Sequence, residues 1–210
     1  MVRIFLALLS LTIHSSEVNW IKFHEEDGVS LYRAPEKKNG LIPFKAEATF
    51  RGTKEDYLKI LLSFSQKNQW APKLKKAKVH RRPAPNQFIF SEYYETPWPA
   101  TDREFLLRGR VEFPSEKVIL LKAENERDLS YAKADHIICD VKILNLELRE
   151  VGESQTKITF EFYGDMKGWM PIWLINLIQK RWPLRFLLSL EEFRSLGQVK
   201  VSEDYLMLEM

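Results

Sequence analysis

The chain has 210 residues, 45% of them hydrophobic and 29% charged, a composition typical of a globular domain with a sizeable core and not of a disordered chain. Its 32 basic and 29 acidic side chains leave a net charge of +3, too even a balance for a nucleic-acid-binding protein. The one cysteine, Cys139, excludes an internal disulfide and a cysteine-based metal site, and we expect it to be a buried, idle thiol.

The N-terminus has the layout of a secretory signal peptide. Arg3 precedes a ten-residue apolar run at 4–13 that is too short to span a bilayer of about 30 Å. Small residues Ser15 and Ser16 follow the run, but His14 or Ile13 stands where a cleavage site prefers a small residue, so an uncleaved anchor or a first core helix is the alternative. We expect a leader at 1–16 and export to the periplasm or the medium, with a cytoplasmic location as the alternative. No linker or repeat divides the remainder, which predicts one domain at 17–197 and a tail at 198–210.

Strands and one helix are expected over the first part of this domain. Residues 29–33 form a short strand, and residues 44–50 alternate with the period of two that favours a half-buried strand. Thr53 then supplies an N-cap hydroxyl before acidic residues, so we expect a helix from there to about Asn68.

A succession of strands follows the helix. Segments 77–82 and 87–95 are strands, and two hairpins pair 103–113 with 117–124 and 138–150 with 155–163, because all are rich in β-branched and aromatic residues. Residues 125–136 are polar and break this rhythm, so we interpret them as a long ordered loop, a common place for a functional lid.

The last clear element is a helix over 171–196, with Pro171 in its first turn and Gly197 as its C-cap. Pro183 interrupts the pattern and should kink or break the helix, leaving its first half nearest a ligand. The bulky apolar stripe of this helix consists of Leu174, Ile178, Trp182, Phe186, Leu190 and Phe193.

Many strands followed by one long helix indicate an α+β fold, in which a curved antiparallel β-sheet wraps around the long C-terminal helix. Such a sheet cannot pack every interior atom against one helix, so we expect an internal apolar cavity. The residues expected to line a ligand there are Phe88, Phe90, Glu92, Tyr94, Phe105, Leu107, Leu174, Ile178 and Trp182.

Three motifs resemble those of START domains, lipid-transfer members of the helix-grip (Bet v 1-like) superfamily. Residues 165–171 read Asp-Met-Lys-Gly-Trp-Met-Pro and lead into Leu174-Ile175-Asn176, similar to the C-terminal signature of that family. Pro97-Trp98-Pro99 followed by 102–105 resembles its Pro-aromatic-Pro loop, and Trp70 matches an expected aromatic. The resemblance, which spans about residues 20–196, implies one lipid held in a tunnel, with the helix 171–196 and a loop within 125–137 as the gate.

Some positions depart from the family pattern. Glu104 replaces the usual Asp, and Gly109 stands where sterol-binding members have a buried Arg, so the resemblance does not imply a sterol site. Glu92 is then a strand-end acid that reaches solvent or a polar anchor for a ligand head group. Arg103 is a structural partner for Asp102 or Glu104, or a contact for an anionic head group.

The function expected is non-catalytic binding, with transfer as an option, of a single lipid or similar molecule. We expect a monomer with transient membrane contact, in which basic residues at 73–78 and 81–82 meet anionic head groups or lie in a solvated edge. We expect no metal, no cofactor and no nucleic-acid partner. One alternative is a cyclase or aromatase on the same scaffold, using Glu92, Tyr93 or Tyr94, and His136; another is an interaction protein whose cavity is filled by its own side chains.

Overall fold

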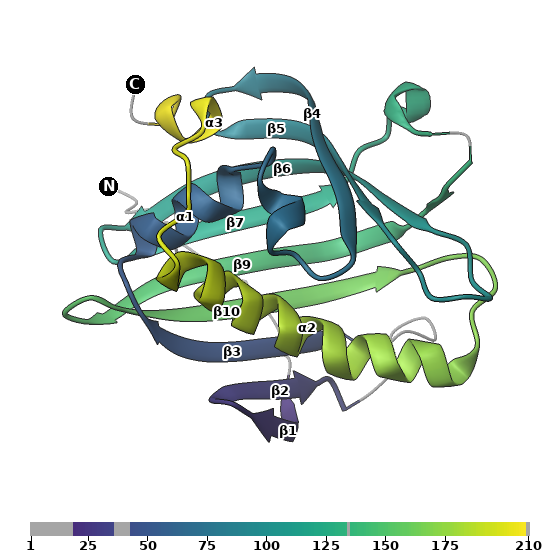
Figure 1. Ribbon diagram of the computed structural model, residues 1–210, viewed down its shortest axis with the longest axis horizontal. Helices are drawn as coiled ribbons and strands as arrows, with labels where there is room; N and C mark the ends of the chain where they lie inside the picture. Colours follow the sequence, from purple (N-terminus) through teal and green to yellow (C-terminus); the bar gives the residue numbers. More distant parts are fainter. Residues whose placement is uncertain (1–18, 36–42, 134, 209–210) are drawn as a thin grey trace, which may run out of the picture.

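The computed structural model describes residues 19–35, 43–133 and 135–208 (Figure 1). The predicted leader at 1–16 lies outside these residues and stays a prediction. In chain order the elements are β1 (Ile21–Glu26), β2 (Val29–Arg33), β3 (Phe44–Arg51), α1 (Lys54–Leu62), the 3-10 turn η1 (Lys67–Gln69), β4 (Leu74–Ala84), β5 (Gln87–Tyr94), β6 (Arg103–Ser115), β7 (Val118–Asn125), η2 (Leu129–Tyr131), β8 (Ile137–Ile138), β9 (Asp140–Gly152), β10 (Gln155–Asp165), α2 (Ile172–Ser195) and α3 (Glu203–Leu206).

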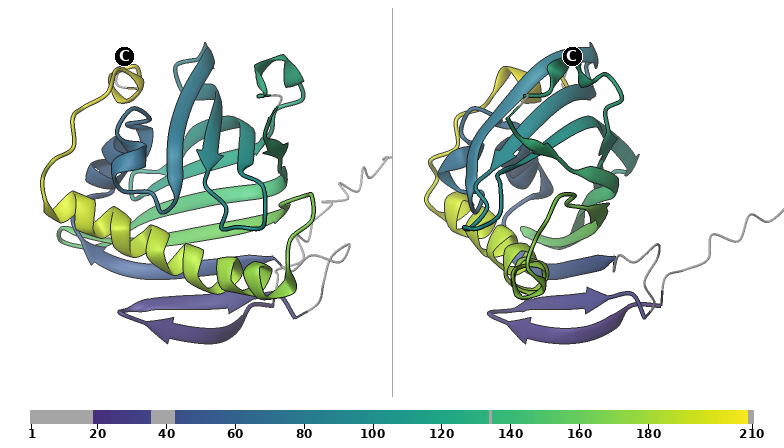
Figure 2. Two further views of the ribbon diagram at one scale, coloured as in Figure 1. Left: turned by 45° about the vertical axis from the view of Figure 1, so that its right-hand side comes forward. Right: turned by 90° about the vertical axis from the view of Figure 1, so that its right-hand side faces the viewer.

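Within the described residues the strands form one antiparallel sheet in the order β1-β2-β3-β10-β9-β7-β6-β5-β4, to which β8 adds a short parallel pairing with β6. Its two ends, β1 and β4, do not pair with each other, so the sheet stays open. Figures 1 and 2 show the sheet curving around α2, which lies along its concave side near β2 and β3. The predicted α+β architecture of a curved sheet around a long C-terminal helix is therefore confirmed.

The two halves of α2 have different surroundings. Its second half carries the buried side chains of Phe186, Leu187 and Leu190, which join the core formed by alternating residues of the strands. Trp173 and Leu177 in its first half are 57% and 40% exposed. The second half thus anchors the helix, and the first half is left to border a cavity. Among the described helices, none is both long and apolar enough to cross a membrane.

The helix continues through Pro183, so the predicted break at that residue is wrong. Proline cannot donate the usual hydrogen bond to the preceding turn, which normally weakens a helix at that point. Here Pro183 is itself buried, and Leu184 beside it is 4% exposed. Packing against the sheet on both sides of the proline holds the helical path.

The first helix begins as predicted and ends early. Thr53 caps it through a reciprocal capping box with Asp56. It stops at Leu62 and not near Asn68, because the chain turns to place the Phe64 ring against the rings of Phe88 and Phe90, at 5.9 and 5.0 Å between centroids.

The segment after Gly197, expected to be a tail, packs against this turn. The Ser202 hydroxyl donates to the Leu62 carbonyl at 3.0 Å, and the Lys200 amide donates to the Gln66 side chain at 2.8 Å. Tyr205 on α3 is 6% exposed and belongs to the core. Residues 198–208 therefore cover the outer end of α1.

Candidate functional site

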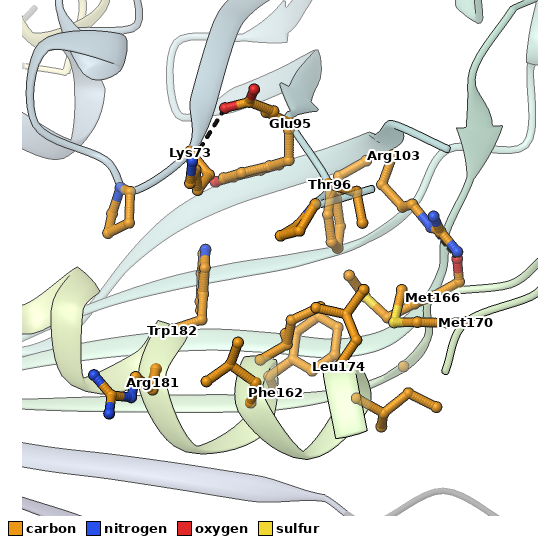
Figure 3. Close-up of a pocket in the computed structure, with 18 of the residues that line it drawn as sticks. Lys73, Glu95, Thr96, Arg103, Phe162, Met166, Met170, Leu174, Arg181 and Trp182 are labelled. Atoms are coloured by element: carbon orange, nitrogen blue, oxygen red, sulfur yellow. Dashed lines mark hydrogen bonds and ion pairs between the residues drawn. The ribbon is translucent and has the colours of Figure 1, made fainter. Parts of the chain in front are cut away.

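A cavity of about 420 Å³ lies between the concave face of the sheet and the first half of α2 (Figure 3). Strands β3, β5, β6, β9 and β10 supply its floor, and the connection between β10 and α2 supplies one end. Most of its lining is apolar. The lining residues that sequence reasoning did not name include Phe44, Leu144, Phe162, Met166, Met170 and Leu177.

The structure brings the nine predicted site residues together around two adjoining cavities. Six of them line the main cavity: Glu92, Tyr94, Phe105, Leu174, Ile178 and Trp182. The other three, Phe88, Phe90 and Leu107, line a second cavity of about 80 Å³ deeper in the core. The period-two alternation of β5 and β6 correctly predicted that the site residues on these two strands lie on the concave face of the sheet. Phe44 and Phe162 could have been found by the same signal, since they alternate with core residues on β3 and β10.

Glu92 is buried, with 5% exposure, so it is not a strand-end acid that reaches solvent. It is also not a lone acid, because the ammonium group of Lys67 on η1 forms an ion pair with its Oε1. The hydroxyl of Tyr94 donates to its Oε2 at 2.7 Å. The cation comes from η1, 25 residues before Glu92 along the chain, and not from β6, where Gly109 stands.

Gly109 faces the second cavity, and a Cβ atom at that position would lie 2.8 Å from Cε1 of Phe90. Such a contact is too close, so any larger side chain there would force Phe90 to move. The packing of Phe90 against Gly109 thus leaves no room for the arginine that the sequence comparison did not expect here.

Arg103 has a structural partner, as expected, but the partner is not an acid. Its guanidinium donates to the carbonyl of Thr101 before β6, and to those of Met166 at 3.3 Å and Lys167 at 2.9 Å after β10. A weaker bond of 3.4 Å reaches the carbonyl of Trp169. Burial lowers the pKa of Arg103 from its ordinary value. The residue joins the two connections that border the open end of the cavity.

Glu104 lies on the opposite face of the sheet and is fully buried there. Its carboxylate accepts hydrogen bonds from the Ser91 hydroxyl at 2.8 Å and the Lys133 amide at 2.9 Å. His136 Nδ1 is 4.0 Å from the same carboxylate, and its ring packs edge-on against Tyr93. Tyr93 and His136 therefore lie away from the cavity. Within the described ranges, no three His, Cys, Asp or Glu side chains gather as metal ligands would.

The described part of the loop 125–137, expected to hold the gate, supplies no residue of the cavity lining. It covers the outer face of the sheet around Glu104 and includes η2. A polar composition identified the loop correctly but could not tell which face of the sheet it covers. The connections that supply lining residues are 72–73, before β4, 95–97, after β5, and 166–170, after β10.

Comparisons with known proteins agree with this geometry. Residues 5–186 match the family model of the START domain. The ceramide transfer protein of Xenopus laevis is 23% identical over 219 residues, which cover 92% of this chain and 34% of that protein, so the chain spans about a third of its length. The phosphatidylcholine transfer protein of Bos taurus is 21% identical over 174 residues, or 80% of each chain.

A solved structure shows the same fold. Human StAR-related lipid transfer protein 5 superposes with a TM-score of 0.78 at 16% identity, over 87% of this chain and 89% of that one. The identity is low, so this likeness concerns the fold alone. The family model, in contrast, covers well over half of the sequence. The chain therefore belongs to the START domain family.

Proposed function

We propose that this protein binds one lipid or similar hydrophobic molecule in the cavity between the sheet and the first half of α2, without catalysing a reaction on it. The observation that carries the proposal is the apolar cavity of about 420 Å³, which falls within the size range of pockets for small molecules, about 300–1,000 Å³. Removing an apolar chain from water supplies the driving force, at roughly 25 cal/mol per Å² of apolar area.

The polar group of the ligand is proposed to stay at the rim. Lys73 and Glu95 form an ion pair of 3.2 Å with side chains more than half exposed, and Thr96 lies beside them (Figure 3). Deeper in the cavity, both oxygens of Glu92 are already engaged by Lys67 and Tyr94. The rim therefore offers solvated polar partners, and the interior suits the apolar part.

The relatives support a class of ligand and not one ligand. One is named for ceramide and another for phosphatidylcholine, at 23% and 21% identity. Both are lipids with a polar head and apolar chains. We extend that class, with exchange of the lipid between membranes, to this chain as a proposal.

Membrane contact is proposed at the open end of the cavity. Trp98 is 89% exposed, Trp169 68% and Trp173 57%. Arg103 holds their two connections together through the carbonyls of Thr101 and Trp169. Tryptophan is favoured where an apolar ring meets a polar interface. Contact at this end would let a lipid pass between bilayer and cavity without crossing water.

The first experiment extracts the purified protein with organic solvent and identifies bound molecules by mass spectrometry, before and after incubation with phosphatidylcholine vesicles. We expect about one lipid per chain. A protein that stays empty in both samples, and whose tryptophan fluorescence does not respond to the vesicles, would contradict the proposal.

A charged variant tests whether α2 lines the site. Ile178→Arg places a cation in the apolar lining, so we expect bound lipid to fall at least about tenfold, since one unpaired buried charge costs several kcal/mol. Leu177→Arg, on the same turn and 40% exposed, tests the more open side and should lose less. Equal lipid content in wild type and Ile178→Arg would show that this helix does not line the site.

The cyclase alternative receives no support from the geometry. Of its acid–base candidates, Tyr93 and His136 lie on the outer face of the sheet, and Glu92 is ion-paired with Lys67. Tyr94 alone would act with Glu92, and its hydroxyl already donates to that carboxylate.

A further inference from the structure

The main and the small cavity meet at four side chains, which line both of them. These are Glu92 and Tyr94 on β5, Leu144 on β9 and Trp182 on α2; we call them the ring. The small cavity beyond the ring is surrounded by core side chains. Among these are Phe64, Phe88, Phe90, Leu107, Ala123 and Phe160.

The ring and the space beyond it suit only the apolar end of a ligand. The carboxylate of Glu92 is paired with Lys67 and with the Tyr94 hydroxyl, so the ring presents no uncompensated buried acid. The lining of the small cavity is mostly aromatic and aliphatic, and its cations are already paired: Lys67 with Glu92, and Arg110 and Lys122 with Glu112. A polar group of a ligand would therefore lose its water there and gain few partners. A ligand that reaches the ring must therefore enter with its apolar chain first.

Trp182 is the member of the ring that comes from the helix and not from the sheet. Tyr94 and Leu144 belong to inner strands of the sheet, and Tyr94 is fixed further by its hydrogen bond to Glu92. The indole of Trp182 makes ring contacts with Tyr94, Phe160 and Phe186, at 5.9, 5.5 and 5.2 Å between centroids.

No hydrogen bond holds the Trp182 indole N–H within the part of the chain that the structure describes. Figure 3 shows this indole extending from α2 into the cavity. A side chain held by ring contacts alone can change rotamer when a ligand atom takes its place. Trp182 therefore stands between the two cavities, and no hydrogen bond within the described residues fixes its indole there.

The volumes say which ligands meet Trp182. The main cavity of about 420 Å³ is about five times as large as the small one of about 80 Å³, so joining the two adds about a fifth to the space open to an apolar chain. A chain too long for the main cavity fits only if Trp182 moves and joins the two spaces.

We propose that Trp182 is a gate that sets the length of the apolar chain this protein accepts. With the indole in place, the ligand is a lipid whose buried chain ends at the ring; with the indole displaced, the chain extends into the small cavity. The proposal rests on the proposed lipid-binding function and adds its specificity determinant.

The test offers delipidated protein an equimolar mixture of saturated lysophosphatidylcholines, from decanoyl to docosanoyl, and identifies the bound species by mass spectrometry. In Trp182→Ala we expect the most abundant bound species to have a longer chain than in the wild type, because the end of the chain can then enter the small cavity. Phe113→Ala is the matched control, because that ring lies away from both cavities, on the part of β6 next to β7, and is 56% exposed. Its chain-length distribution should equal that of the wild type.

A second variant works from the other side of the gate and does not depend on Trp182→Ala folding. Ala123→Leu adds an isopropyl group to a side chain that lines the small cavity, and so fills part of it. Alone it should remove the longest chains from the wild-type distribution, and combined with Trp182→Ala it should cancel the shift. If the wild type, Trp182→Ala and Ala123→Leu all bind lipid with the same chain-length distribution, the gate is overturned and the lipid-binding function stands. If none of them binds any lipid, the proposed function fails, and the gate with it.

Discussion

The guanidinium of Arg103 is fully buried and donates to backbone carbonyls that lie on two separate connections. A planar fork of donors suits this arrangement, since it can reach several carbonyls at once, which an ammonium group cannot. The carbonyls of Met166 and Lys167 belong to the connection after β10, so their hydrogen bonds tie that connection to the start of β6. At the scale of one residue, Arg103 thus fixes the border of the cavity.

Arg103→Lys should lower the free energy of unfolding by about 2–3 kcal/mol, because hydrogen bonds to a charged donor contribute about 1.5–3 kcal/mol and some carbonyls would be left unpaired. Urea denaturation measures the loss. Arg110→Lys is the control, since Arg110 lies on the same strand with its side chain 51% exposed. A loss for Arg103→Lys no larger than for the control would contradict this role.

The Lys67–Glu92 pair invites a second prediction at the same scale. Lys67→Met leaves a buried carboxylate without its cation, and breaking such a pair costs about 3–5 kcal/mol. Adding Glu92→Gln removes the charge but keeps an acceptor for the Tyr94 hydroxyl, so the double variant should regain much of the stability. Chemical denaturation measures the free energy of unfolding of both variants. A double variant that is less stable than Lys67→Met would contradict the prediction.

At the scale of elements, one cluster holds α2 to α1. The Tyr57 hydroxyl lies 2.6 Å from the carboxylate of Glu191 and 2.5 Å from the carbonyl of Arg51. Arg194 donates to both oxygens of Glu191, at 2.7 and 2.8 Å. Burial alone would raise the pKa of Glu191, but the hydrogen bonds from Arg194 and Tyr57 outweigh it and lower the pKa from its usual value of 4.5.

A carboxyl group whose pKa is lower in the folded state stabilises the fold above its unfolded pKa. That contribution is present at neutral pH and is lost as the pH falls below 4.5 and through the folded value. Glu191→Gln should therefore cost about 1–2 kcal/mol at neutral pH and weaken the pH dependence of unfolding in that acidic window. Thermal denaturation over a pH series measures it. Glu192→Gln, at the exposed neighbouring position, should leave the profile unchanged.

The elements also show what a sequence pattern can and cannot predict. Alternation predicted the inward faces of β5 and β6, since period two follows directly from the pleat of a strand. β1 escaped notice because it is an edge strand, mostly exposed, with no apolar alternation to mark it. Lys67 could not be paired with Glu92 from sequence, because a turn that ends a helix early brings them together.

For the molecule as a whole, the two ends of the sheet differ in exposed apolar surface. The end at the cavity opening presents Trp98, Trp169 and Trp173, whose segments lie together in Figures 1 and 2. The other end, where β6 turns into β7, presents Phe113 at 56% exposure. If the molecule meets a bilayer with its open end, the tryptophans contribute and Phe113 does not.

We therefore expect Trp98→Ala and Trp169→Ala each to weaken binding to phosphatidylcholine and phosphatidylserine vesicles roughly tenfold, which corresponds to about 1.4 kcal/mol of lost ring insertion. Phe113→Ala removes a comparably exposed ring at the far end and should bind vesicles like the wild type. Co-sedimentation measures the affinity, and blue-shifted tryptophan emission reports insertion. If all three variants weaken binding equally, the protein contacts vesicles without a preferred face. The proposed direct transfer of a lipid from the bilayer into the cavity would then be contradicted.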